Sequence, residues 1–392
     1  MRRKGWVDGY DCLIIPHPYP DELLSSWLTR TAFAHGYSLT TFLSLFIKHD
    51  GSALSRIDLD FNDTKALISQ LASKCHLNVQ TLQSLSLRSE EGYLFEGDSA
   101  TLYPPKQIRK LKDKRTHYGL MFCPKCLAED SQPYWRKQWR YLFYNACPKH
   151  RVFLMDRCWV CYERVRFSKM KPSEEIVYCS RCEHDLRQTL THPISMEQSF
   201  GIQAIEWFEQ GLKEGYFEIN NTKISSLFVF HVYNLLYYKI ASLKDALRFE
   251  AFPMIDAYNQ LYSKEAHYHS KKATLIYKNF YLTAMIHQLF QNFPINLIQF
   301  AKDNNLTHRD FLHSTKIAPF WFKEAIDQSI PLQDTVGRII SENEVKGAIK
   351  YLKSIGKNIN QKNVADILGC HFTLHKQFVA LYKTMALRYG RI

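Results

Sequence analysis

The sequence has no long apolar run. No stretch of about eighteen residues is apolar enough to cross a bilayer, and no apolar signal-peptide core follows the basic residues Met1-Arg2-Arg3-Lys4. We therefore expect a cytoplasmic protein with no membrane partner. Its 392 residues are 46% hydrophobic and 14% aromatic, which suffices for packed cores in roughly two to four domains.

Common catalytic motifs are also missing. There is no Gly-x-x-x-x-Gly-Lys-Ser/Thr phosphate loop, no His-Glu-x-x-His and no His-x-Glu of the zinc deaminases. His308-Arg309-Asp310 copies a kinase catalytic loop, but no glycine-rich loop or Asp-Phe-Gly accompanies it. The paired acids Asp58 and Asp60 are interpreted as ordinary surface charge. We expect no catalytic residue and no enzymatic activity.

Acidic residues are scarce relative to basic ones. The chain has 51 Lys and Arg against 38 Asp and Glu, a formal charge of +13. Between Pro104 and Arg151 there are twelve Lys and Arg but three acids, a charge distribution that attracts phosphate backbones. A solvated basic face is the alternative. The aromatic residues of this stretch, such as Trp135 and Trp139, could stack on bases but are most simply core. The candidate contact residues are Arg109, Lys110, Lys112, Arg136, Lys137 and Arg140.

Seven of the ten cysteines and one histidine form four pairs, each with two residues between its members. Such spacing makes a tight turn that aims both side chains at one metal ion. Grouping sequential pairs gives two complete tetrahedral donor sets, so we expect two structural Zn²⁺ ions. Disulfides, buried thiols and a crossed grouping of the pairs stay open. The first set is Cys123, Cys126, Cys147 and His150, and the second is Cys158, Cys161, Cys179 and Cys182.

The rest of the chain is patterned as helices, so the expected fold is mainly α and multi-domain. Apolar periodicity predicts helix pairs in the first hundred residues, the first pair meeting at Gly36 with Ser38 as a cap, a helix-turn-helix-like arrangement. Short β elements are expected only within the zinc module. The expected domains are a helix-turn-helix-like domain at 1–104, a tandem zinc module at 105–192, a helical domain at 193–335 and a helix-turn-helix-like unit at 336–392.

The C-terminal unit is a candidate for contact with DNA. Helices are predicted from Glu344 to Ser354, from Gln361 towards Gly369 and from Thr373 to Ala386, with the spacing of a helix-turn-helix motif. His375 occupies a position where a buried aliphatic residue is usual. The candidate contacts are Lys376, Lys383 and Arg388.

Two of these regions resemble a known family. The segment from Pro18 to Arg30, Pro-Tyr-Pro-Asp-Glu-Leu-Leu-Ser-Ser-Trp-Leu-Thr-Arg, with Gly36 after it, resembles the N-terminal signature of the TniQ family. The Cys/His pairs, together with Tyr134-Trp135-Arg136 and Trp139, are similar in order and spacing to that family's central zinc region. The resemblance covers roughly residues 16 to 185. TniQ proteins, which include TnsD, select target sites for transposition.

This resemblance implies a non-enzymatic adaptor of bacterial transposition. It would link a target-recognition complex, such as an RNA-guided CRISPR complex of the Cascade type with its guide RNA, to an AAA+ ATPase regulator of the TnsC type. The alternative is a TnsD-like protein, or a zinc-containing regulator, that binds target DNA directly. A zinc hydrolase or nuclease is a third class. A second copy of the chain and association with the nucleoid are also expected of an adaptor.

Overall fold

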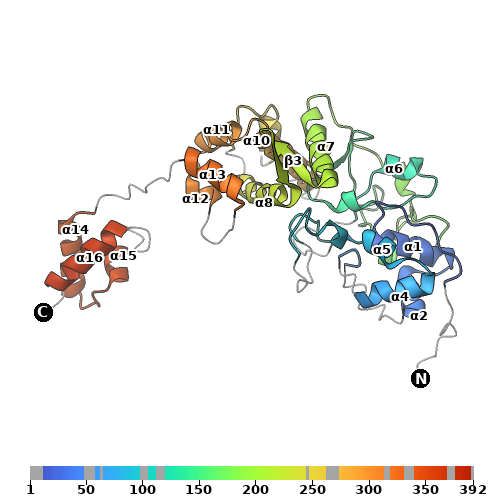
Figure 1. Cartoon of the computed structure of the whole chain (residues 1–392), viewed down its shortest axis with the longest axis horizontal. Helices are drawn as coiled ribbons and strands as arrows, with labels where there is room; N and C mark the ends of the chain where they lie inside the picture. Colours follow the sequence, from blue (N-terminus) through green and yellow to red (C-terminus); the bar gives the residue numbers. More distant parts are fainter. Residues whose placement is uncertain are drawn as a thin grey trace, which may run out of the picture. The chain divides into compact units, whose positions relative to one another are not determined.

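The computed structural model describes residues 12–47, 58–61, 65–97, 105–111, 120–243, 247–261, 273–312, 318–330, 340–368 and 376–389. These residues form a mainly helical protein with a few short strands (Figure 1). The chain divides into two compact units, the first made of 1–306 and 310–325 and the second of 307–309 and 326–392. The finer division into four domains stays a prediction.

The N-terminal part of the first unit consists of short helices, and the first two meet at Gly36 and Ser38 as predicted. Ser38 caps the second helix by accepting a hydrogen bond from the Thr41 amide, and Asn78 caps another through the Gln80 amide. Gly36 lies in the left-handed region, with a φ of 72°. The helices are α1 (Leu24–Ala34), α2 (Leu39–Phe46), α4 (Lys65–Cys75), α5 (Val79–Ser84) and the 3-10 turn η1 (Leu87–Glu90).

Residues 120–194 form a platform of turns and very short elements. Strand β1 (Ala146–Cys147) pairs antiparallel with β2 (Val152–Phe153). Trp135 and Trp139 are buried, which confirms the interpretation of these rings as core. The remaining elements are α6 (Pro124–Glu129), η2 (Lys137–Arg140), η3 (Phe167–Lys169) and η4 (Leu186–Gln188).

Longer helices follow the platform. Helices α7 (Ser199–Glu214), α8 (Ser226–Leu243) and α10 (Ala273–Phe290) pack through aromatic side chains such as Phe208 and Phe230. A β-hairpin between α7 and α8 was not predicted. The other helices are α9 (Ile255–Gln260), α11 (Ile295–Asp303), α12 (His308–Phe311) and α13 (Phe320–Ser329).

The hairpin pairs β3 (Tyr216–Ile219) with β4 (Thr222–Ser225) through Asn220 and Asn221. Both asparagines have a positive φ, 51° and 57°, as a two-residue hairpin turn requires. The signal was present in the sequence, since an Asn-Asn pair between alternating residues is a turn pattern.

The second unit contains α14 (Glu342–Ser354), α15 (Gln361–Leu368) and α16 (Lys376–Tyr389). Ser341 and Glu344 form a capping box at the start of α14. The three helices share an apolar core, so the predicted helices are confirmed, while the turn between α15 and α16 lies outside the described residues. The core consists of Val345, Ala348, Ile349, Leu352, Val364, Ala365, Leu368, Phe378 and Met385.

Helix α1 is attached to the platform by backbone and side-chain hydrogen bonds. The amide of Leu23 donates to the Trp135 carbonyl at 2.8 Å, and the Trp135 amide donates to the Ser26 hydroxyl at 3.0 Å. Buried Glu22 accepts from the Ser26 hydroxyl at 2.7 Å and forms an ion pair with Arg30, also at 2.7 Å. These contacts join the first predicted domain to the zinc module.

A second junction is formed by Arg140, which is buried between two carboxylates. Its guanidinium lies 2.6 Å from a carboxylate oxygen of Asp58 and 2.9 Å from one of Asp60. Asp60 also accepts from the amide and the hydroxyl of Ser25 in α1. The expectation that Asp58 and Asp60 are ordinary surface charge is therefore wrong, because both carboxylates face a buried cation.

Replacing Arg140, the cation of this junction, should destabilise the protein strongly. Arg140→Ala would leave Asp60 buried without its ionic partner, and breaking such a buried pair costs about 3–5 kcal/mol. Lys110→Ala, at an exposed position, should change stability by less than about 0.5 kcal/mol. Urea unfolding monitored by circular dichroism measures both variants. Equal stability of Arg140→Ala and the parent chain would contradict the junction.

The same junction predicts a dependence of stability on pH. Burial raises the pKa of Asp60 to about 6 from its ordinary value of 3.8, against the opposing effect of Arg140. Between these values the folded state binds more protons than the unfolded state, so the contribution of Asp60 to stability falls as the pH rises through this window. Unfolding free energies at pH 4.5 and 6.5 should show this component in the parent chain. Its persistence in Asp60→Asn would exclude Asp60 as the source.

Candidate metal centres and basic residues

The first Cys/His set converges from two turns of the platform. Cys123 caps the N-terminus of α6 and Cys126 lies in its first turn, while Cys147 ends β1 and His150 precedes β2. The Cys126 and Cys147 sulfurs are 3.6 Å apart, and His150 Nδ1 lies 3.3–3.5 Å from all three sulfurs. Tetrahedral zinc bonds of about 2.3 Å to sulfur and 2.0 Å to nitrogen would separate the donors by about 3.5–3.8 Å. The donors thus lie at the corners of a metal-sized tetrahedron.

His150 is oriented by a carboxylate behind it. Its Nε2 lies 2.7 Å from a carboxylate oxygen of Glu129, and a proton on Nε2 leaves the Nδ1 lone pair directed towards the sulfurs. Lys149 forms an ion pair with the same carboxylate at 2.5 Å. Sequence reasoning missed Glu129, which spacing alone does not distinguish from a surface acid.

The second set is formed by two knuckle turns of the same geometry. Sulfur distances are 3.6 Å between Cys158 and Cys182 and 3.5 Å between Cys161 and Cys179. In each turn the first cysteine amide donates to a carbonyl five residues later, that of Glu163 or His184. The four donor atoms of each set lie within 4.8 Å of one another.

These distances decide between the groupings left open by the sequence. Sequential pairs come together, so a crossed grouping is excluded, and sulfurs more than 3 Å apart are not in disulfides, whose bond length is about 2.05 Å. Burial raises the pKa of Cys158 to about 12, and hydrogen bonds from Cys123 and Cys147 raise the pKa of Cys126 far above its ordinary value. Adjacent thiols therefore resist ionising together without a cation. Each set could hold one metal ion.

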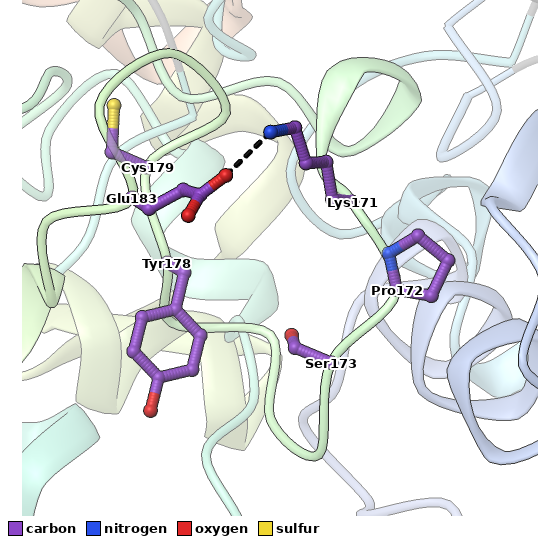
Figure 2. A pocket seen from close by; sticks show the side chains of 6 residues that line it. All are labelled: Lys171, Pro172, Ser173, Tyr178, Cys179 and Glu183. Atoms are coloured by element: carbon purple, nitrogen blue, oxygen red, sulfur yellow. Dashed lines mark hydrogen bonds and ion pairs between the residues drawn. The ribbon is translucent and has the colours of Figure 1, made fainter.

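A cavity of about 320 Å³ adjoins the second set (Figure 2). Cys179 forms part of its wall, and an ion pair between Lys171 and Glu183 crosses it. Cys182 is exposed on the same knuckle, whereas the three cysteines of the first set are buried. Solvent therefore reaches the second set more readily than the first. The cavity is completed by Pro172, Ser173 and Tyr178.

Two of the predicted basic contact residues lie inside the protein. Arg109 and Arg140 are only 2% and 1% exposed. The guanidinium of Arg109 donates to the carbonyls of Trp139 and Tyr144, both at 3.0 Å, and to the Asn145 side chain. The expectation that these two arginines form a contact surface is wrong, because they satisfy buried carbonyls and carboxylates.

Two other predicted contacts are held by acids. Arg136 binds both carboxylate oxygens of Asp130, at 3.0 and 2.7 Å, and its guanidinium lies over the Tyr134 ring. Lys137 forms a 3.0 Å ion pair with Glu90. The six residues therefore do not line one open basic face.

The remaining predicted contacts are divided between exposed and undescribed positions. Lys110 and Lys383 are exposed, so their contact roles stay predictions. Lys112 lies outside the described residues, as do the side chains of Lys376 and Arg388.

The structure thus defines a mainly helical protein whose N-terminal helices are fixed to a platform with two closed Cys/His sets. Residues 13–154 match the family model TniQ. The match includes α1 and the first metal set and ends before the second. No curated protein matches the chain. The TniQ match points to a transposition-associated target-selection role. No described helix is long and apolar enough to span a membrane.

Metal analysis should find about two ions per chain, with zinc as the metal, since Cys₃His and Cys₄ are donor sets that zinc prefers. Cys126→Ser should give a protease-sensitive protein with at most one ion, because a structural site supplies folding energy to its module. A chelator should remove the ion of the more exposed second set first. Cys75→Ser, a buried cysteine outside both sets, is the matched control. A folded chain with no bound metal would refute the two-site interpretation.

Proposed function

We propose that this chain is a non-enzymatic target-selection adaptor of a transposon. It would link a target-recognition complex, such as an RNA-guided CRISPR complex of the Cascade type, to an AAA+ ATPase that recruits the transposase. The observation that supports this proposal is the TniQ match over the fixed unit of α1 and the platform. An adaptor acts only through binding, so a rigid frame that keeps its contact surfaces at fixed positions suits the role.

Two Zn²⁺ ions serve this frame as structural ions in the proposal. All four positions of each set are occupied by protein donors, which leaves no open position for a water or substrate. Cys123 and Cys126 fix the start of α6 next to the segment that receives α1. When bound, the ions would tie the loops of the platform into one body, and the chain's own side chains would make the partner contacts.

A direct DNA reader is the second candidate, and one feature of the structure favours it. The second unit is a compact three-helix body with its own core and few acids. Its described residues include four acids, Asp327, Glu342, Glu344 and Asp366, of which Glu342 and Glu344 lie in the first turn of α14. Such a charge balance attracts phosphates but does not by itself read a sequence. The basic residues of its segments 340–368 and 376–389 are Lys346, Lys350, Lys353, Lys357, Lys362, Lys376, Lys383 and Arg388.

The two candidates differ in what the isolated chain does to DNA. A direct reader should prefer its own site over random duplex by about a thousandfold or more. The adaptor should bind duplexes weakly, with a steep loss of affinity in salt and little preference among sequences. Selection of bound duplexes from a random library at physiological salt measures the preference. A strongly enriched sequence would favour the direct reader and contradict the adaptor.

The adaptor should also be needed to bring the ATPase to the target. With the guide complex on its matched DNA, ATPase recruitment should depend on adding this chain and should disappear with mismatched guide RNA. Single-molecule or pull-down detection of labelled ATPase on DNA measures this. The folded variant Lys110→Ala tests a contact by an exposed basic residue, with Lys302→Ala, on α11, as its control. ATPase recruitment in the absence of the chain would contradict the proposal.

A further inference from the structure

The first knuckle of the second metal set exposes apolar side chains. Trp159, Val160 and Tyr162 are 39%, 56% and 67% exposed, although they lie in a turn whose cysteines face inward. Of the described tryptophans, only Trp159 is exposed. The exposed aromatic residues of the platform are therefore not at 134–144, where the rings are largely buried, but are Trp159 and Tyr162 at this knuckle and Tyr178 before the second.

Tyr162 has a backbone conformation that glycine adopts more easily than tyrosine. Its φ is 58°, in the left-handed region, and Glu183 occupies the corresponding place of the second knuckle with a φ of 59°. Glycine adopts this conformation without the steric cost that a side chain incurs. Because the Tyr162 ring is mostly exposed, it returns little burial energy. Glycine at this position would stabilise the knuckle at least as well as tyrosine does. We therefore infer that the ring contacts a ligand or a partner.

Two arginines belong to the same pair of knuckles or their flanks. Arg164 follows the first knuckle and Arg181 lies within the second, and the two knuckles meet at the same four sulfurs. Among the described residues, no acidic side chain forms an ion pair with either arginine. Glu163, next to Tyr162, forms ion pairs with Arg166 and Lys169 and also interacts electrostatically with Arg181.

We propose that this surface, defined by Trp159, Tyr162, Arg164 and Arg181, binds single-stranded nucleic acid. Unpaired bases would stack on the two rings, and the guanidinium groups would contact the phosphates between them. A duplex fits the surface less well, because its paired bases hide their faces from aromatic side chains. A partner protein with an apolar pocket is the competing occupant. The surface goes beyond the proposed adaptor function, because none of the partners proposed above is assigned to it.

Intrinsic fluorescence provides a direct assay on the full chain. Oligothymidylate and oligouridylate of fifteen nucleotides should quench Trp159, and a duplex of equal length should quench it much less. Trp159→Ala should abolish the fluorescence change and, measured by anisotropy of labelled oligonucleotide, should weaken binding about tenfold. Tyr162→Gly should weaken binding similarly while leaving the thermal midpoint unchanged or higher. Loss of binding with retained stability is a result that a purely structural tyrosine would not give.

The arginines are tested by the dependence of affinity on salt. If Arg164 and Arg181 each contact one phosphate, replacing both with Gln should reduce the slope of log affinity against log salt by about 1.4, from about 0.7 per contact on single strands. Phe228→Ala, an exposed aromatic on α8, is the matched control and should bind as the parent does. Metal content is measured for every variant to show that the knuckles are intact.

Several results would overturn the proposal. The first is equal affinity for single strands and duplex. The second is unchanged oligonucleotide affinity in Trp159→Ala and Tyr162→Gly. The third is a loss of oligonucleotide affinity in Phe228→Ala as large as in the knuckle variants. Failure of the knuckle variants to bind the purified ATPase, with oligonucleotide binding intact, would assign the surface to protein docking instead. Because the oligonucleotide assay contains no transposition component, its outcome is separate from that of the adaptor proposal.

Discussion

The position of α1 on the platform depends on one buried cation. Arg140 is surrounded by Asp58, Asp60 and the Arg109 carbonyl, and Asp60 in turn holds the first turn of α1 through Ser25. Taking these charges out of water is costly unless every one of them has a partner, so the three segments can pack only in the arrangement that pairs them. Hydrophobic contacts alone would tolerate sliding of α1. The ionic junction, together with the hydrogen bonds that join Leu23 and Ser26 to Trp135, gives it a defined register.

The two metal sets fix the platform in a different way. With strands of two residues and one-turn helices, this region has little regular hydrogen bonding, and its rings surround a small core. Metal ions held by both sets would supply the order that longer elements would otherwise give. The Glu129 carboxylate, which is not itself in the donor set, fixes the orientation of the His150 ring. Contacts with partners must then be made by the exposed residues, which lie mainly in turns and on helix surfaces.

Sequence patterns predicted the parts of this structure that depend on local rules. Ligand spacing grouped the cysteines correctly, and the cap at Ser38 marked a helix start, because both follow from a few adjacent residues. The basic stretch was misread, since Arg109 and Arg140 find their partners only when distant segments meet. The Asp-x-Asp pair was misread for the same reason. Charge counts describe composition, whereas burial depends on the tertiary partner.

The residues by which the family is recognised are mostly internal. Glu22, Ser25, Ser26 and Trp27 of the signature are buried in α1 or at its start, and Trp135 lies beneath them. A signature of buried residues indicates a shared scaffold but does not predict which residues lie on the surface. Two chains can therefore carry the same signature and serve different partners, provided that their exposed turns differ. The buried residues that define the signature and the exposed residues that contact partners are separate sets. Either set can change in evolution while the other is conserved.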